Sequence, residues 1–213
     1  SAASADLRWG LLYSPTRFAG LQVILQALGG GSGLIVPDSI SGLDNAVQLL
    51  ARHSCNALSA TPSLWRKLAF SGLLNSLNLA VVTLGGETAD QKILDELKRH
   101  FPFATIRHIY ASTEAGVGFS VSDGQAGFPR SYLNDPPPWV ELLLDEDGIL
   151  MLRPRDANQR LLSDSGSLSD KKGWISSGDL VKLRNDRCYF LGRSNGTINV
   201  GGVKVHPSQV EET

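Results

Sequence analysis

Apolar residues in the first half of the chain recur at helical spacing in some segments and form short continuous runs in others. The helical segments are residues 18–28, 44–50, 61–68 and 87–100. The short runs, which are typical of buried strands, are residues 34–36, 56–60, 79–84 and 105–110. Because the two kinds of segment alternate, the pattern predicts a largely parallel sheet with crossover helices.

Local signals mark where these helices begin and end. The run Gly29-Gly30-Gly31 is a stop signal after the first helix. Either Asp44 or Asn45 can cap the second helix. The third begins at Thr61-Pro62, where proline is harmless in the first turn.

Helical periodicity disappears after about residue 115. Short strand candidates follow at residues 140–144, 149–152, 180–183 and 188–191, and polar turns separate the members of each pair. The fold class that we predict is α/β, a parallel sheet with crossover helices followed by a small barrel-like β subdomain. The expected domains are 1–114 for the α/β part, 115–193 for the β subdomain, and 194–213 for a hinge leading into a further domain.

Composition narrows the function classes. The formal net charge of −1 gives no general electrostatic reason to bind nucleic acid or an anionic membrane. No apolar stretch approaches the ~20 residues of a membrane span. The first six residues lack the basic-then-apolar order of a secretory signal, so we expect a cytoplasmic protein. Cys55 and Cys188 lie far apart in sequence, match no metal or redox spacing, and are expected to be unrelated thiols.

Candidate chemistry lies where predicted strands end, because ligands of open parallel sheets sit beyond the carboxyl ends of the strands. The run Tyr110-Ala111-Ser112-Thr113-Glu114 places a hydroxyl and a carboxylate there, which suit a phosphate and its Mg²⁺. The alternative is a helix cap.

Two glycine-containing segments also follow or join strands. In Leu84-Gly85-Gly86-Glu87 the glycines let a flat ligand approach the backbone, unless the segment is only a tight turn with Glu87 starting the next helix. In Ser177-Gly178-Asp179 the carboxylate can accept ribose hydroxyls, unless the segment is an ordinary turn.

The run from Gly192 to Pro207 carries most information. Arg193 has the planar fork that binds phosphate or ribose oxygens. The following Ser194, Asn195 and Gly196 are turn-prone and suit a linker or hinge.

Taken in order, these segments resemble the adenylate-forming superfamily of acyl- and aryl-CoA synthetases, peptide-synthetase adenylation domains and luciferases. Residues 110–114 resemble its Tyr-Gly-x-Thr-Glu motif, with alanine in place of glycine. Residues 174–179 resemble its Trp-x-x-Thr-Gly-Asp motif, with Ser177 in place of threonine. Residues 192–212 resemble its hinge motif. The resemblance runs from about Tyr13 to Glu212.

The resemblance implies a role for each matching residue. Tyr110 would stack on adenine, Thr113 would meet the α-phosphate and Glu114 would hold Mg²⁺. Gly85, Gly86 and Glu87 would line the adenine pocket, Asp179 would bind the ribose, and Arg193 would bind ribose and phosphate. Asn195 would lie at the hinge, and Lys204 would lie in the segment used for thioester formation. The acid would be surrounded by Phe18, Leu84 and Ala111. The implied activity is that of an AMP-forming acid–thiol ligase, which uses ATP and Mg²⁺ and then coenzyme A or phosphopantetheine. The partners are a small carboxylic acid and, as one of two possible acceptors, an acyl carrier protein.

Departures from the family pattern leave alternatives open. The phosphate loop with its lysine is absent, and Gly29–Gly33 is not that loop because it follows a helix and precedes a strand. The family's catalytic lysine is also absent, and Lys204 is not that residue. Since one lost donor can cost ~10²–10³ in rate, the isolated chain is expected to be nearly inactive.

The chain is therefore expected to be a fragment of a longer synthetase, which its end inside the hinge motif favours, or a naturally short homologue. A degenerate, non-catalytic binding or scaffold module is the alternative function. The segment 13–20 has no acidic residue for a substrate ammonium, which favours an acid other than an amino acid. A dinucleotide-binding oxidoreductase is disfavoured, because no Gly-x-Gly-x-x-Gly follows a strand.

Overall fold

The structure, a computed structural model, describes residues 6–38, 42–112, 116–155, 170, 172–196, 198–200 and 203–205. Within these ranges it describes only the backbone of residues 112, 116, 117, 195, 198–200 and 203–205. The chain divides into two compact units. Unit 1 comprises residues 1–109 and 120–125, and unit 2 comprises residues 110–119 and 126–213.

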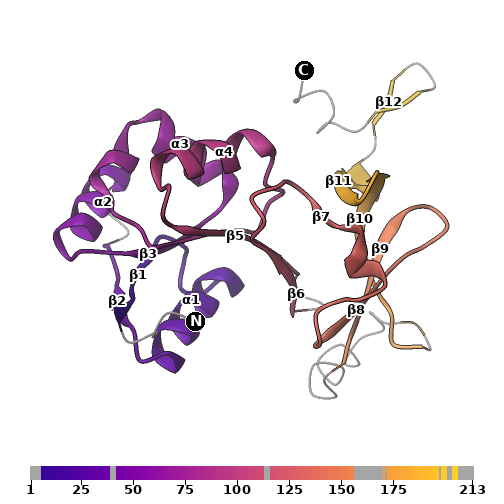
Figure 1. Cartoon of the computed structure of the whole chain (residues 1–213), viewed down its shortest axis with the longest axis horizontal. Coiled ribbons are helices and arrows are strands. Elements are labelled where there is room, and N and C mark those ends of the chain that lie inside the picture. The colour runs from indigo at the N-terminus through magenta and orange to yellow at the C-terminus, as the bar shows by residue number, and fades with distance from the viewer. Residues whose placement is uncertain are drawn as a thin grey trace. The chain divides into compact units, whose positions relative to one another are not determined.

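Unit 1 is an alternation of strands and helices (Figure 1). Its elements are β1 (Arg8–Leu11), α1 (Phe18–Gly29), β2 (Gly33–Ile35), α2 (Gly42–Arg52), β3 (Ala57–Ala60), α3 (Pro62–Phe70), the 3₁₀ turn η2 (Leu73–Ser76), β4 (Val81–Gly85), α4 (Gln91–His100) and the first residues of β5 (Thr105–Ser112). The strands follow the order β2-β1-β3-β4-β5-β6, in which β6 is Gly116–Val121, and β1 to β5 pair in parallel. The predicted parallel sheet with crossover helices is therefore confirmed.

Helices cover both faces of this sheet. In Figure 1, α1 lies on one side of the strands, and α2, α3 and α4 lie on the other. On its inner side α1 buries Gly20, Val23 and Ala27, and the last two pack with Trp9 and Leu11 of β1. Because side chains alternate along a strand, each strand contributes every second residue to the α1 face.

Helix ends depart from the sequence prediction in two places. Helix α2 starts at Gly42, so neither Asp44 nor Asn45 caps it. Helix α4 starts at Gln91 rather than at Glu87, because the Asp90 side chain accepts a hydrogen bond from the Ile93 N–H and fixes the first turn there. The predicted start of a helix at Thr61-Pro62 is confirmed, and the Thr61 side chain caps it by accepting a hydrogen bond from the Leu64 N–H.

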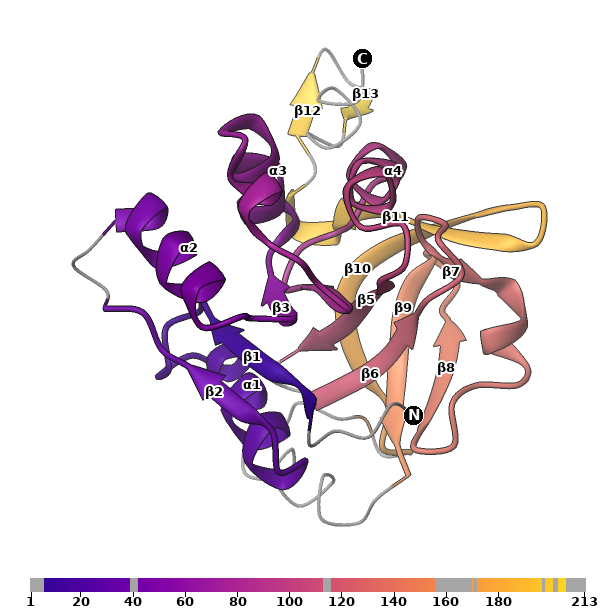
Figure 2. The same ribbon diagram turned by 60° about the vertical axis from the view of Figure 1, so that its left-hand side comes forward.

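Unit 2 is built on a curled antiparallel sheet (Figure 2). Its strands are β7 (Phe128–Pro129), β8 (Val140–Leu144), β9 (Ile149–Pro154), β10 (Ile175–Arg184) and β11 (Arg187–Arg193), with the 3₁₀ turns η3 (Arg130–Leu133) and η4 (Ser194–Gly196) and the small hairpin of β12 (Ile198–Val200) and β13 (Val203–Val205). The order of the main sheet is β7-β11-β10-β9-β8. The predicted fold class, a parallel sheet with crossover helices followed by a β subdomain, is thus the observed one.

The sequence pattern missed five strands. These are β1, β6, β7, β12 and β13. Strand β1 contains Gly10, which is disfavoured in strands, yet a Cβ there would lie 2.9 Å from both the Leu50 and the Leu58 side chains. The glycine is therefore explained by close packing that only the folded structure reveals.

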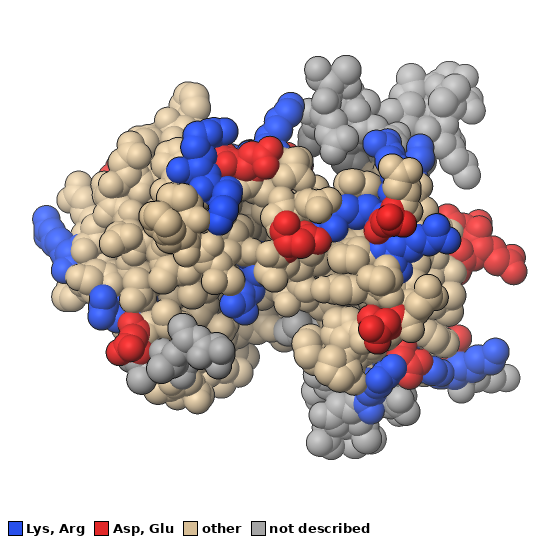
Figure 3. All heavy atoms as spheres, viewed as in Figure 1, with Lys and Arg blue, Asp and Glu red and all other residues tan. Residues whose placement is uncertain are grey.

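The surface charge and the two cysteines can be compared with what the composition led us to expect. On the face drawn in Figure 3, basic and acidic side chains are interspersed rather than gathered by sign. Within the described ranges, no helix is both long and apolar enough to cross a membrane. Cys55 and Cys188, which were expected to be unrelated thiols, are both free, and both are buried.

Candidate functional site

The segment Ser177-Gly178-Asp179 forms an irregularity in β10. Pairing with β9 is regular at Ile175 and Ser176, then shifts before Leu180. Gly178 has φ of +70°, a left-handed conformation that a side chain would strain. The Asp179 N–H donates to the Ser177 hydroxyl over 3.0 Å. The irregularity thus leaves Asp179 out of the ladder with β9, while Asp179 still pairs with Arg193 of β11.

Asp179 is bound by two side chains in unit 2. Its Oδ2 accepts a hydrogen bond from the Tyr110 hydroxyl over 2.5 Å, and its Oδ1 lies 2.9 Å from Arg193 Nε. Arg193 also donates from Nη1 to the Ser177 carbonyl over 2.9 Å. The Asp179 side chain is 16% exposed and that of Arg193 is 60% exposed. The structure therefore brings together three predicted site residues that are far apart in sequence.

The ring of Tyr110 is held between two phenylalanine rings, which the sequence did not indicate. Its ring stacks against Phe119, with 5.1 Å between centroids, and against Phe190, with 5.0 Å. Burial, followed by the hydrogen bond to Asp179, raises the pKa of the Tyr110 hydroxyl well above its usual value. An adenine ring that stacks on Tyr110 has to compete with these two phenylalanines.

In unit 1, the turn after β4 contains Gly85, Gly86 and Glu87. Gly86 has φ of +82°, which explains why glycine stands there. The Glu87 carboxylate accepts hydrogen bonds from the Ser63 N–H over 2.9 Å and from its hydroxyl over 2.5 Å. Ser63 lies in the first turn of α3, so Glu87 caps that helix and does not begin α4.

Tyr13, which follows β1, reaches the same turn. Its hydroxyl lies 3.4 Å from the Gly85 carbonyl oxygen, to which it donates. Burial raises the pKa of the Tyr13 hydroxyl to about 12, a hydrogen bond from Ser59 opposes the shift, and the negative charge of Glu87 adds to it. The hydroxyl is therefore neutral at physiological pH.

Of the three residues expected around the acid, Phe18 and Leu84 belong to unit 1 and Ala111 belongs to unit 2. Phe18 begins α1 and is 39% exposed. Leu84 is fully buried on the face of the sheet opposite to α1, where Leu58 and Val82 also point. Ala111 is partly exposed on β5 in unit 2. The role of Leu84 that the structure supports is core packing.

Other predicted residues lie beyond what can be described. Thr113 and Glu114 fall outside the described residues, and of Asn195 and Lys204 only the backbone is described. In the part of the chain that the structure describes, no cluster of three or more His, Cys, Asp or Glu side chains is arranged to hold a metal ion.

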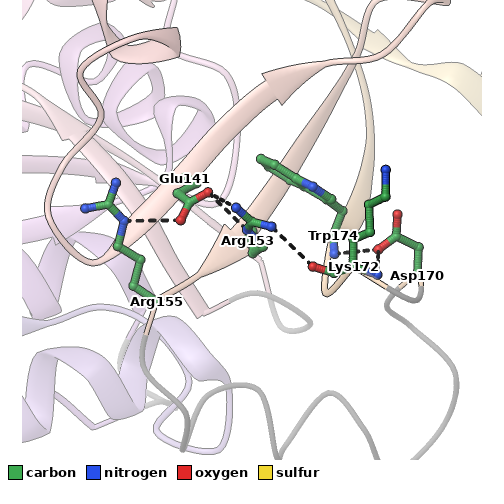
Figure 4. Close-up of polar contacts among 6 residues, drawn as sticks. All are labelled: Glu141, Arg153, Arg155, Asp170, Lys172 and Trp174. Atoms are coloured by element: carbon green, nitrogen blue, oxygen red, sulfur yellow. Dashed lines mark hydrogen bonds and ion pairs between the residues drawn. The ribbon is translucent and has the colours of Figure 1, made fainter.

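A cluster beside β10 was not anticipated from the sequence (Figure 4). Arg153 of β9 forms a salt bridge with Glu141 of β8, and its guanidinium lies 4.7 Å from the centre of the Trp174 ring. Arg155 also lies near Glu141, with 3.5 Å between Nε and Oε1. The cluster holds Trp174 just before the strand that carries Asp179. The opposite charges of Glu141 and Arg153, which strand pairing places opposite each other, were the available signal.

A family comparison matches most of the chain. The model described as "AMP-binding enzyme" matches residues 3–147. This span contains every described element of unit 1 and the beginning of unit 2.

Curated relatives are similar over nearly the whole chain but are much longer. The 4-coumarate–CoA ligase 3 of Arabidopsis thaliana is 24% identical over 211 residues, which is 89% of this chain and 37% of the relative. The acyl-CoA ligase AFT1-1 of Alternaria alternata is also 24% identical, over 89% of this chain and 37% of the relative. The chain spans little more than a third of the length of these proteins.

Solved structures share the fold. An arginine-to-lysine variant of E. coli MenE with bound OSB-AMS aligns over 99% of this chain and 45% of its own, with a TM-score of 0.73 and 18% identity. The O-succinylbenzoate coenzyme A synthetase from Bacillus subtilis, in complex with ATP and magnesium ion, aligns over 98% of this chain and 46% of its own, with a TM-score of 0.68 and 19% identity.

Proposed function

Because the chain belongs to the family of AMP-binding enzymes, we propose that it forms part of a cytoplasmic enzyme that activates a carboxylic acid with ATP. A carboxylate oxygen of the acid attacks the α-phosphorus of ATP and pyrophosphate leaves, which gives an acyl-adenylate. A thiol sulfur then attacks the acyl carbon and AMP leaves. The thiol is that of coenzyme A or of a phosphopantetheine on a carrier protein, and the relatives named as CoA ligases favour the first.

The arrangement of Asp179, Arg193 and Tyr110 is the observation that carries this proposal. An ionised carboxylate offers about four lone-pair positions, and Tyr110 and Arg193 use one each. Asp179 can therefore still accept ribose hydroxyls. Arg193 has five N–H groups, of which its contacts with Asp179 and Ser177 use two, so its exposed edge can donate to ribose or phosphate oxygens.

Tyr110 contributes to this site mainly through its hydroxyl. Because its ring is held by Phe119 and Phe190, the hydroxyl is aimed at Asp179 before any ligand arrives. Such preorganisation lowers the ordering cost of binding. We assign the adenine pocket to the backbone of Gly85 and Gly86, with Glu87 holding their turn against α3.

The phosphate end of the site rests on residues whose side chains are not described. Thr113 is proposed to meet the α-phosphate and Glu114 to hold Mg²⁺, the hard cation that carboxylates prefer. Bound Mg²⁺ would neutralise charge that develops on the phosphate oxygens. Asn195 is proposed as the hinge, and Lys204 as part of the segment that serves thioester formation.

Calorimetric titration with AMP and with a non-hydrolysable acyl-adenylate analogue tests the proposed site. We expect Asp179→Asn to weaken AMP binding by about tenfold or more, since a hydrogen bond to a charged group contributes ~1.5–3 kcal/mol. Asp147→Asn, in an exposed turn, is the matched control. Equal AMP affinity of wild type and Asp179→Asn contradicts the assignment, and no binding of either ligand supports the alternative of a non-catalytic scaffold.

A further inference from the structure

A row of four side chains, three of them polar, crosses the α1 face of the sheet in unit 1. Strand pairing places Leu11, Ser59, Thr83 and Arg107 opposite one another on β1, β3, β4 and β5. In-register residues of parallel strands point to the same face. That face is the one that α1 covers, because Ala57, two residues before Ser59, packs with the α1 residues Val23 and Ala27. Ser59 and Thr83 are 8% and 5% exposed.

Arg107 is the exceptional member of this row. Its Nε is buried, and among the described residues it has no hydrogen-bond partner. A buried N–H that lacks a partner costs ~1–3 kcal/mol, and more when the group is charged. Proteins rarely keep such a group without a reason, and one reason is a ligand that supplies the acceptor.

The neighbouring groups favour an acceptor on the ligand. The hydroxyls of Ser59 and Thr83 share the row with Arg107, and the neutral Tyr13 hydroxyl hydrogen-bonds with Ser59 beside it. The positions on either side of Arg107 on this face are Thr105 and Ile109, so β5 brings no carboxylate to it. Because Ser59 donates to Tyr13 and Tyr13 donates to the Gly85 carbonyl, the described groups of this row that remain to donate to a ligand are the Arg107 guanidinium and the Thr83 hydroxyl, a combination that suits an anionic oxygen.

This part of the face is also open to a ligand. Arg107, Ile109 and Gly85 are all partly exposed, whereas the positions beneath α1, such as Ala57, are fully buried. Arg107 lies two residues before Ile109, the partner of Gly85, and so about 7 Å back from the carboxyl ends of the strands. Ligands of such sheets bind at those ends.

We propose that Arg107 is a specificity-determining residue that binds a second carboxylate at the far end of the acid, so that the substrate is a dicarboxylic acid. The inference rests on the proposed function, in which the first carboxylate attacks the α-phosphorus of ATP.

The test compares adipate with hexanoate, which has the same number of carbons and one carboxylate fewer. Both are titrated into the chain at constant ionic strength, without nucleotide, and ligand-induced shifts of the unfolding midpoint and of backbone amide resonances are recorded. Wild type is expected to bind adipate at least about tenfold more tightly than hexanoate, and Arg107→Met is expected to remove that difference. Arg99→Met, which changes an exposed arginine of α4, should leave it intact.

The unfolding midpoint of each variant without ligand separates a binding role from a structural one. Because Met places no unsatisfied donor in the sheet face, Arg107→Met should unfold at the same or a higher temperature than wild type, and Arg107→Lys should keep part of the preference for adipate. Equal affinity of wild type for adipate and hexanoate overturns the inference, as does an Arg107→Met variant that retains the preference. Since no nucleotide is present, the outcome is independent of the Asp179 titration, and either result can fail while the other holds.

Discussion

At the scale of single residues, the structure assigns Glu87 a contact that the sequence did not predict. The sequence placed Glu87 at the start of a helix and in the adenine pocket, whereas its carboxylate accepts both the N–H and the hydroxyl of Ser63. With Thr61, which accepts the Leu64 N–H, it satisfies two of the free donors at the start of α3.

Removing this cap should destabilise the protein. We expect Glu87→Ala to lower the free energy of unfolding by about 1 kcal/mol, the usual effect of losing a capping acceptor. Urea denaturation of Glu87→Ala, Ser63→Ala and the double variant measures the coupling between the two side chains. Glu146→Ala, in an exposed turn, is the control. A Glu87→Ala variant as stable as wild type would contradict the capping role, and additive effects of the two single substitutions would show that the two side chains are not coupled.

At the scale of elements, the two glycines near the ends of α1 differ in how closely other atoms pack against them. A Cβ on Gly20 would lie 2.1 Å from the Ser14 carbonyl oxygen, so the loop before α1 can approach only a glycine. A Cβ on Gly29, at the other end of the helix, would meet nothing within 4 Å.

Alanine substitution at the two sites should therefore differ in sign. Gly20→Ala is expected to lower the free energy of unfolding by about 1–3 kcal/mol, because backbone atoms must move. Gly29→Ala is expected to be neutral or to raise it by up to about 1 kcal/mol, because alanine restricts the unfolded chain more than glycine. Thermal and urea unfolding of the two variants provide the measurement, and a stable Gly20→Ala with an unstable Gly29→Ala contradicts the described packing.

Element identity was largely predictable, and the misses have physical causes. Periodicity located the helices α1, α3 and α4 and most buried strands, because burial of one face imposes the spacing. It missed β1, whose pairing with β2 and β3 depends on residues more than 20 positions away. The start of α4 was misplaced because Asp90 outcompetes Glu87 as the cap.

Candidate site residues could be predicted from the sequence only where they belong to a recognisable motif. Asp179, Arg193 and Tyr110 were chosen from three separate motifs, and the structure joins them through direct contacts. Nothing in the sequence showed that Phe119 and Phe190 stack on Tyr110, or that Leu84 points away from α1, because both depend on strand pairing. Arg107 carried only a weak signal, a charge inside a predicted strand.

At the scale of the whole molecule, a buried tyrosine hydroxyl and two buried thiols should lower the stability of the fold at alkaline pH. Burial raises the pKa of the Cys55 and Cys188 thiols to about 11 and that of Tyr13 to about 12. Their ordinary values are 9.0 for the thiols and 10.0 for tyrosine. The folded protein therefore keeps protons that the unfolded chain releases.

The free energy of unfolding should consequently be independent of these groups below about pH 9 and should fall as the pH rises from about 9 to 11. Urea midpoints measured across that range test the prediction. Cys188→Ala, which removes one of the groups, should flatten the decline. A midpoint that stays constant or rises over the same range would mean that these side chains are ionised in the folded protein.

The central claim concerns acid activation by the intact protein of which this chain carries the Asp179 site. Acid-dependent exchange of labelled pyrophosphate into ATP tests it most directly, because exchange requires a reversible attack of the carboxylate on the α-phosphorus. The account predicts exchange with at least one acid of a panel that includes dicarboxylates and their monocarboxylate counterparts, and a loss of at least tenfold in Asp179→Asn. A folded protein that supports no exchange with any acid contradicts it.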